Sequence, residues 1–120
     1  MRTKQELLDR LRTYKGAEYI YTNNGYIAWQ YSTGENIEII FIESKEKGLG
    51  YGRELVKEMC KVINPYYSVF VMRLASNEDA GKFYRALGFR EYIIRELYKG
   101  DDAIIGVIPF AKLCQNLLIK

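Results

Sequence analysis

The sequence of 120 residues contains no histidine, only two cysteines and only two prolines. Without histidine, the protein has no imidazole for acid–base catalysis and lacks the side chain that most zinc sites use. Cys60 and Cys114 form no CxxC motif and lie in apolar helical patterns, so we interpret them as buried, reduced thiols of an intracellular protein. We therefore expect no metal site.

Long apolar runs and clusters of one charge are missing as well. No apolar run reaches the length of about 20 residues that crosses a bilayer, and the first ten residues are too charged for a secretion signal. The formal net charge is only +3, and Lys and Arg do not gather in runs as nucleic-acid-binding surfaces require. We expect a soluble, cytoplasmic protein that binds neither membranes nor a specific nucleic acid.

The spacing of apolar residues predicts an alternation of helices and strands. We expect helices at 3–14, from the glycine-rich segment to Asn64-Pro65, at 76–88 and after Pro109, and strands in 18–31 (a hairpin), 36–43, 67–75, 90–98 and 102–108. The order is helix, three strands, helix, strand, helix, two strands, helix. It indicates one α+β domain, residues 1–120, with a mixed sheet.

Glycines and asparagines mark where these elements end. Asn24-Gly25 predicts the turn of the first hairpin, because this pair tolerates the positive φ of a type I′ turn. Lys99–Asp102 is predicted to link the last two strands. Gly88 stands where a glycine commonly ends a helix in the left-handed conformation.

The segment Lys47-Gly48-Leu49-Gly50-Tyr51-Gly52 lies between a predicted strand and a predicted helix. Glycines there expose backbone N–H groups at the positive end of the helix dipole, an arrangement that suits phosphate. The plain alternative is a tight turn. A Walker A loop is excluded because GxxxxGK[ST] is missing, and a dinucleotide fingerprint is excluded because the spacing is GxGxG rather than GxGxxG.

Two strings together resemble the signatures of the GNAT family of N-acetyltransferases. Residues 47–52 match its coenzyme A signature, Q/R-x-x-G-x-G/A, at the start of a helix. A second signature, N-x-x-A-x-x-F-Y-x-x-x-G-F, is matched by Asn77, Ala80, Phe83, Tyr84, Gly88 and Phe89. The resemblance spans about residues 17–108, and it implies a central, mostly antiparallel mixed sheet, flanked by helices and splayed between strands 36–43 and 67–75.

The resemblance implies a site for coenzyme A. The pantetheine arm would pair with the exposed backbone of strand 36–43, and the pyrophosphate would lie on the amides of the glycine loop. The implied contacts are Phe41, Ile42, Glu43, Lys47, Gly48, Leu49, Gly50, Tyr51, Gly52, Arg53, Asn77, Ala80, Phe83 and Tyr84. The implied donor is acetyl-CoA, as a cosubstrate without a metal.

The resemblance also implies catalytic residues. Transfer to an amine needs a base for the amine and a proton for the departing thiolate. Glu38, within strand 36–43, and Glu43, near its end, are candidate bases, and Tyr84 matches the tyrosine that protonates the thiolate. In a regular strand the two glutamates face opposite sides, whereas a bulge would change that parity. We favour Glu38 and keep Glu43 as the alternative.

The expected function is acetyl-CoA-dependent N-acetylation by direct attack in a ternary complex. The acceptor would be a primary amine, either a lysine or N-terminus of a peptide or protein, or a small molecule, and a homodimer could complete its site. The alternatives are a non-catalytic acyl-CoA-binding regulatory module and a scaffold in which the glycine loop is only a turn.

The chain departs from the family pattern at four places. Lys47 replaces the usual Gln or Arg, and Ser44 replaces a common proline. One predicted helix precedes the first hairpin, where the family usually has a strand and two helices, and the helix after Pro109 is an addition. The last two changes affect the region where acceptor sites are usually built, so they leave the acceptor open.

Overall fold

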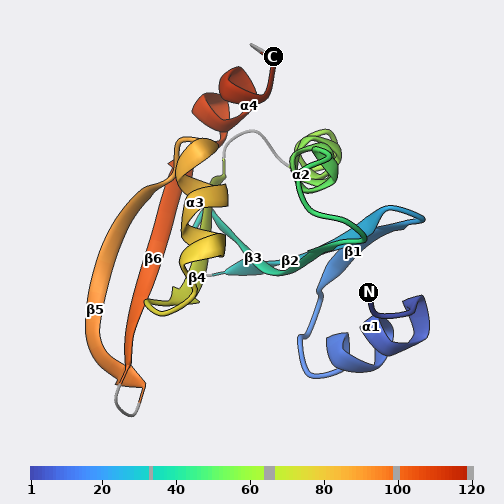
Figure 1. Cartoon of the computed structure of the whole chain (residues 1–120), viewed down its shortest axis with the longest axis horizontal. Helices are drawn as coiled ribbons and strands as arrows, with labels where there is room; N and C mark the ends of the chain where they lie inside the picture. The colour runs from blue at the N-terminus through green and yellow to red at the C-terminus, as the bar shows by residue number, and fades with distance from the viewer. Residues whose placement is uncertain (33, 64–66, 99–100, 119–120) are drawn as a thin grey trace.

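The computed structural model describes residues 1–32, 34–63, 67–98 and 101–118, except the side chains of 95–98 and 101. The elements, in chain order, are α1 (Lys4–Leu11), β1 (Glu18–Thr22), β2 (Gly25–Ser32), β3 (Asn36–Ser44), α2 (Tyr51–Cys60), β4 (Ser68–Leu74), α3 (Glu78–Ala86), β5 (Arg90–Tyr98), β6 (Asp101–Pro109) and α4 (Phe110–Leu118) (Figure 1). This order confirms the predicted α+β class. α2 ends at Cys60, before the predicted end at Asn64-Pro65, which is therefore wrong. Asn64-Pro65 and half of the Lys99–Asp102 turn lie outside the described residues.

The six strands form one mixed sheet in the order β1-β2-β3-β4-β6-β5. Only β3 and β4 are parallel, and their pairing is short, joining Asn36–Ile39 to Ser68–Val71. Beyond Ile39, β3 continues with β2 and β4 continues with β6. Figure 1 shows the two halves of the sheet turning away from each other. The predicted splay between these two strands is confirmed.

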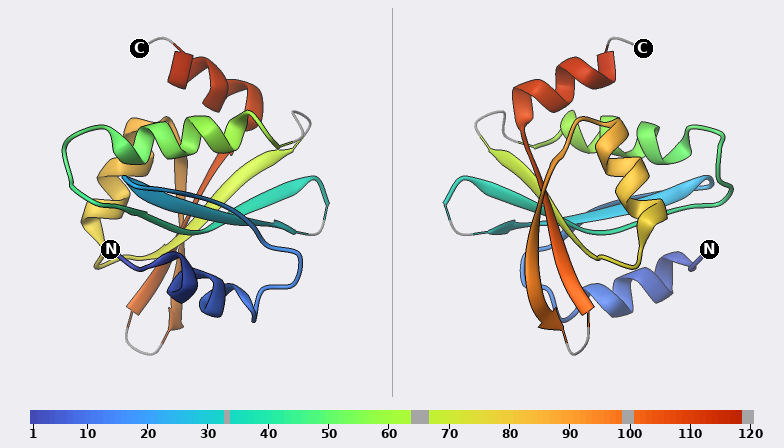
Figure 2. Two further views of the ribbon diagram at one scale, coloured as in Figure 1. Left: turned by 90° about the vertical axis from the view of Figure 1, so that its right-hand side faces the viewer. Right: turned by 60° about the vertical axis from the view of Figure 1, so that its left-hand side comes forward.

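Helices cover both faces of the sheet. On one face, residues of α2, α3 and α4 pack in the main core with the odd-numbered side chains of β2, β3 and β4, among them Trp29, Ile39 and Val71. On the other face, Leu7 and Leu11 of α1 pack on Tyr26 and Ala28 of β2. Figure 2 shows α1 and α2 on opposite sides of the sheet. None of the helices within the described residues is long and apolar enough to cross a membrane.

The first hairpin differs from its prediction by one residue. Asn23 and Asn24 form the loop, and Gly25 is already paired with Thr22 as the first residue of β2, so the turn predicted at Asn24-Gly25 is wrong. The glycine is needed for another reason, because a Cβ at Gly25 would collide with the carbonyl oxygen of Glu43 on β3.

The end of α3 confirms the predicted role of Gly88, which has a φ of +98°. The Gly88 N–H donates to the Arg85 carbonyl at 2.9 Å, and the Phe89 N–H donates to the Tyr84 carbonyl at 3.1 Å. These two bonds form a Schellman motif. Its usual apolar contact is present, since the rings of Tyr84 and Phe89 lie 5.3 Å apart.

The two cysteines are free thiols on α2 and α4, and both are half-buried rather than fully buried. Burial and the neighbouring Cys114 raise the pKa of Cys60 to about 12. At neutral pH the Cys60 thiol is therefore protonated and a weak nucleophile.

Candidate active site

The end of β3 presents an unpaired backbone edge to the opening of the sheet. The Lys45 N–H donates to the Asn24 carbonyl at 2.7 Å, which makes this a bonded pair of the β2–β3 ladder. Bonded and non-bonded pairs alternate in an antiparallel ladder, so Phe41 and Glu43 direct their backbone groups to β2. Of the three predicted backbone contacts, Ile42 is therefore the residue that points its N–H and C=O toward the opening.

The loop after β3 leaves the first turn of α2 uncovered. Gly48 and Gly50 have φ values of +81° and +80°, in the left-handed region where side chains are strained. A Cβ at either position would have no heavy atom within 4 Å, and no side chain caps α2 at Gly50. The amides at this positive helix end are therefore not covered by side chains, an arrangement that can accommodate a phosphate group.

The third glycine of the loop has a different task. Gly52 lies within α2, and a Cβ there would come within 3.0 Å of the Phe83 ring on α3. Phe83 also contacts Tyr84, with ring centroids 5.1 Å apart. Gly52 thus allows α2 and α3 to approach each other beside the opening.

The two basic side chains of the loop point in different directions. Lys47 Nζ lies 3.4 Å from Asp79 Oδ2 on α3, in an exposed ion pair that spans the opening. Arg53 Nη2 instead donates to the carbonyls of Asn116 and Leu117, at 2.8 and 3.2 Å. The Arg53 guanidinium therefore stabilises the C-terminus of α4, and only its backbone amide belongs to the glycine loop.

A bulge in β3 places both candidate bases on one face. Gln30 pairs with Glu38 and Tyr26 pairs with Glu43, although the glutamates are five positions apart in the sequence and their partners only four. The register shifts opposite Ala28 and Trp29, where β3 has one residue more. The parity expected for a regular strand is thus wrong, and the alternative with a bulge is confirmed.

The surroundings of the two glutamates differ. Glu43 accepts hydrogen bonds from the Tyr26 hydroxyl at 2.6 Å and the Arg2 N–H at 3.2 Å. The Tyr26 bond, together with the Arg2 amide, holds the pKa of Glu43 below its usual value. Glu38 accepts a hydrogen bond from Gln30 Nε2 at 2.9 Å. Glu43 is therefore tied to the segment before α1, and Glu38 to a neutral amide on the neighbouring strand.

Tyr84 lies on the opposite face from Glu38, in the main core. Its side chain is only 4% exposed and is held between the rings of Phe83 and Phe89. Burial raises its pKa, so the hydroxyl stays protonated at neutral pH. Asn77, also predicted at the site, caps α3 by accepting the Ala80 N–H at 3.2 Å. Ala80 itself packs on the core.

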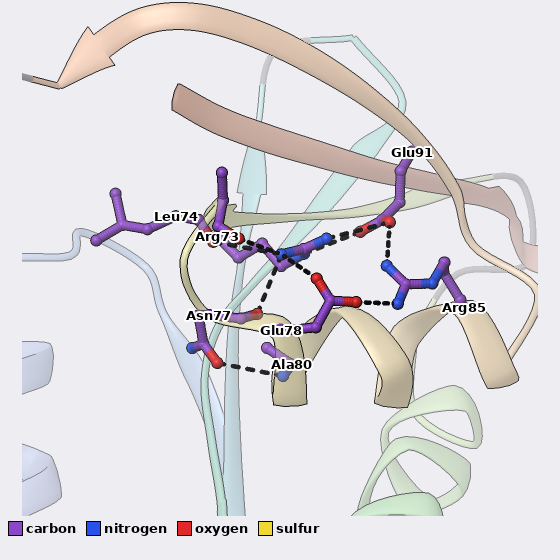
Figure 3. A network of polar contacts seen from close by, with 8 residues as sticks. Arg73, Leu74, Asn77, Glu78, Ala80, Arg85 and Glu91 are labelled. Atoms are coloured by element: carbon purple, nitrogen blue, oxygen red, sulfur yellow. Dashed lines mark hydrogen bonds and ion pairs between the residues drawn. The ribbon is translucent and has the colours of Figure 1, made fainter. Parts of the chain in front are cut away.

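A buried arginine, which the sequence motifs do not mark, holds the connection from β4 to α3 (Figure 3). Arg73 is 8% exposed and binds Glu91 of β5 through Nε and Nη2, at 2.9 and 3.2 Å. Its Nη1 donates to the carbonyls of Leu74, Ala75 and Asn77. The network continues through Arg85 to Glu91 and Glu78. An arginine in the apolar strand 67–75 was the available signal, since a buried charge needs partners.

No group of three or more Cys, Asp or Glu side chains in the described residues is arranged to hold a metal ion. What the geometry offers instead is an open strand edge, an uncapped helix start beside it, a carboxylate on one face and a phenol on the other. This combination can bind an extended ligand with a phosphate group and move protons at one end of it.

Known proteins resemble this chain in sequence family and in fold. The family model described as acetyltransferase (GNAT) domain matches residues 11–91. The ribosomal-protein-S18-alanine N-acetyltransferase from Escherichia coli aligns with a TM-score of 0.68 at 19% identity, over 92% of this chain and 79% of that chain. A GNAT family acetyltransferase from Elizabethkingia anophelis with acetyl-CoA bound aligns with a TM-score of 0.67 at 22% identity, over 89% and 83%. An acetyltransferase of the GNAT family from Bacillus cereus gives 0.65 at 19%, over 88% and 78%. A comparison with curated protein sequences gave no match.

Proposed function

The chain belongs to the acetyltransferase (GNAT) family, and from that premise we propose that it is an N-acetyltransferase that uses acetyl-CoA to acetylate a primary amine. The observation that carries the proposal is the junction of the open β3 edge with the uncapped start of α2. Ile42 offers backbone groups to an extended arm, and the amides after Gly48 and Gly50 offer a phosphate site a few residues further on.

The residues of this chain would divide the binding of the donor among them. The amides of the glycine loop would hold the pyrophosphate, with Lys47 adding a flexible positive charge once it leaves Asp79. The backbone of β3 at Ile42 would pair with the pantetheine arm. Phe83, Ala80 and Asn77 would line the α3 side. When bound, acetyl-CoA supplies a thioester, whose acetyl group is transferred.

Glu38 is the base in this proposal. A lysine-type amine has a pKa of about 10.4 and is almost fully protonated at neutral pH, so a carboxylate has to accept its proton, directly or through water. Glu38 lies at the last paired rows of β3 and β4, just before the sheet opens. Glu43 is engaged by Tyr26 and the Arg2 amide, and its lowered pKa makes it a weaker base. Its role would be to fix the start of the chain on β3.

Tyr84 is the acid. Glu38 would accept the proton that the ammonium group loses before the attack. As the nitrogen–carbon bond forms and the carbon–sulfur bond breaks, the nitrogen would lose its second proton to water, and the Tyr84 hydroxyl would give a proton to the sulfur and regain one from solvent. Because the pairing of β3 and β4 ends at Ile39, a thioester placed between the two strands could be reached from both faces of the sheet.

Calorimetry with acetyl-CoA tests the donor site. We expect wild type to bind in the micromolar range and Gly50→Asp to lose at least about tenfold in affinity, because a carboxylate would repel the pyrophosphate. Gly16→Asp is the matched control, since Gly16 has a similar φ of +75° and open space around it, far from the loop. Equal losses in both variants, or no binding by wild type, would contradict the site.

Turnover separates an enzyme from a non-catalytic acyl-CoA-binding module. In a panel of amines, Glu38→Gln and Tyr84→Phe should each lower kcat by about 10²–10⁴-fold, the usual range for losing a general base or acid, while acetyl-CoA affinity stays within a factor of about three. An unchanged kcat in both variants would contradict the roles of Glu38 as the base and Tyr84 as the acid. Binding of acetyl-CoA without turnover of any amine would favour the regulatory module.

A further inference from the structure

Asn116 of α4 contacts the helices on both sides of the opening. Its side-chain Nδ2 donates to the Leu87 carbonyl at the end of α3, at 2.8 Å, and its backbone carbonyl accepts a hydrogen bond from Arg53 Nη2 of α2, also at 2.8 Å. α2 begins at the glycine loop, and α3 carries Tyr84. One residue of α4 therefore binds both the helix proposed to hold the donor and the helix that carries the proposed acid.

The position of α4 is fixed by the sheet and by the core. β6 ends at Pro109 and α4 begins at the next residue, Phe110, so no loop lies between them (Figure 1). Leu113 and Leu117, one helical turn apart, are 0% and 3% exposed in the main core. Asn116 directly precedes Leu117, so its amide belongs to a turn of helix that the core holds in place.

The bond from Asn116 reaches the last turn of α3, which begins at Tyr84. Leu87 is the C-cap of α3, and carbonyls at a helix end have no partner within the helix. The Tyr84 carbonyl accepts the N–H groups of Leu87 and Phe89, both at 3.1 Å. Gly88 leaves the room for the Asn116 amide, because a Cβ there would collide with Nδ2. Asn116 therefore binds the same closed turn that fixes the backbone of Tyr84.

The proposed reaction depends on the position of α3 relative to α2. The pyrophosphate would be held at the start of α2, which determines where the thioester lies, whereas the proton of Tyr84 comes from α3. A misplacement of about 1 Å can lower a rate about 10²-fold. Phe83 and Gly52 bring the two helices together by packing, which has no fixed direction. The hydrogen bonds of Asn116 add a defined orientation, because they weaken when their angles change.

We propose that Asn116 is a positioning residue for Tyr84, which places the phenol of α3 at the thioester of a donor bound on α2. The inference rests on the proposed function and adds a residue of α4 to it. α4 follows residues 11–91, which the family model matches, so this contribution comes from a part of the chain outside the match. Asn116 acts without touching the reacting atoms, and its effect on the rate therefore has to pass through Tyr84.

Asn116→Asp and Gln115→Glu are a matched pair for the test. Both change an amide to a carboxylate of almost the same size on α4, and both add one negative charge, but Gln115 is exposed. A carboxylate has no donor for the Leu87 carbonyl, so Asn116→Asp loses the bond to α3. Asn116→Ala is a second variant, which removes the bond without adding a charge. Urea denaturation of each variant checks that it is folded under the assay conditions.

We expect Asn116→Asp and Asn116→Ala to lower kcat at least about tenfold and to leave the acetyl-CoA affinity within about threefold, while Gln115→Glu changes both by less than about twofold. The sharpest comparison uses Tyr84→Phe as the starting protein. There Asn116→Asp should change kcat by less than about twofold, because the group that Asn116 positions has been removed. An equal loss of kcat in both backgrounds, or no loss in either, would overturn the proposal while acetyl transfer stands.

Hydrogen exchange tests the contact without turnover. The N–H groups of Gly88 and Phe89 are hydrogen-bonded in the closed turn, and they should exchange at least about tenfold faster in Asn116→Asp than in wild type or Gln115→Glu. Faster exchange supports the positioning of α3 by Asn116 even if wild type acetylates no amine, a result that would count against the proposed enzyme alone. Unchanged exchange in Asn116→Asp would overturn the proposal, because the turn would then hold Tyr84 without Asn116.

Discussion

Two connections lead from parallel strands to helices at the open end of the sheet, and they are built in opposite ways. Between β3 and α2, two glycines take left-handed conformations and no side chain caps the helix. Between β4 and α3, Asn77 caps the helix, acidic residues occupy its first turn, and Arg73 binds three carbonyls of the connection. Side chains thus cap the N-terminus of α3 but leave the N-terminus of α2 uncapped. An uncapped start next to a capped one indicates where an anionic ligand is expected to bind.

The largest effect should follow from removing the arginine of the closed connection. Arg73→Met would remove the guanidinium that binds the Glu91 carboxylate and three backbone carbonyls. Breaking a buried ion pair of this kind costs about 3–5 kcal/mol. Urea denaturation measures the loss. Arg85→Met is the control, because Arg85 binds the same Glu91 from a more exposed position, and it should cost about 1 kcal/mol or less. Equal costs would mean that the carbonyl contacts of Arg73 contribute nothing.

The cap of α3 should give an intermediate effect. Asn77→Ala removes the acceptor of the Ala80 N–H and should lower the free energy of unfolding by about 1 kcal/mol. Asn77→Asp keeps an acceptor and should stay close to wild type in stability. If the acetyl-CoA affinity of Asn77→Ala falls by no more than its lost stability explains, Asn77 acts only as a helix cap. A larger fall in affinity would indicate that Asn77 also contacts acetyl-CoA directly.

A smaller effect, visible through pH, concerns the strand that leads into the open connection. The pKa of Glu43 is lowered in the folded protein by Tyr26, so the folded state binds a proton less readily than the unfolded state. Its stabilising contribution is complete above the unfolded pKa of about 4.3 and is lost as pH falls through the lower folded value. Tyr26→Phe should therefore flatten the loss of stability between about pH 5 and pH 3.

Tyr21→Phe is the control for that measurement, since the Tyr21 hydroxyl binds the Arg2 carbonyl rather than a carboxylate. Urea midpoints at several pH values in this range are compared for the three proteins. The same flattening in Tyr21→Phe, or an unchanged slope in Tyr26→Phe, would contradict the assignment of the pKa shift to the Tyr26 bond.

The smallest change in stability is expected at the ion pair that spans the two connections. Lys47 and Asp79 are both exposed, and such pairs contribute about 0–1 kcal/mol. Lys47→Ala should hardly alter the urea midpoint but should weaken acetyl-CoA binding several-fold and reduce its dependence on salt. Asp79→Ala should have the opposite effect on affinity, because it frees Lys47. If both variants change the acetyl-CoA affinity in the same direction, the ion pair, rather than the Lys47 charge alone, supports binding.

Local chemistry was sufficient to predict much of this fold. The end of α3 at Gly88 depends on residues within one turn and was predicted from the sequence, as was the place of the glycine-rich segment between β3 and α2. The splay of the sheet was predicted only through the family resemblance, because it depends on where two distant strands stop pairing.

Contacts between distant segments account for what was missed. The bulge that puts Glu38 and Glu43 on one face exists because β3 carries one extra residue opposite Trp29, which no property of strand 36–43 alone reveals. Gly25 was misplaced in a turn because its need for space comes from Glu43 on β3. The bonds of the Arg53 guanidinium to α4 were not predicted, because they depend on where a helix more than 60 residues further along the chain packs.

The position of α4 couples the two halves of the sheet. Arg53 of α2 donates to carbonyls near its end, and Asn116 Nδ2 donates to the Leu87 carbonyl after α3 at 2.8 Å. Gly88 leaves the room that this amide occupies. Helices from both sides of the opening are thus joined through a segment that follows the matched residues 11–91. A movement of α2 relative to the end of α3 would break these contacts, so we expect α4 to hold the two helices at a fixed spacing.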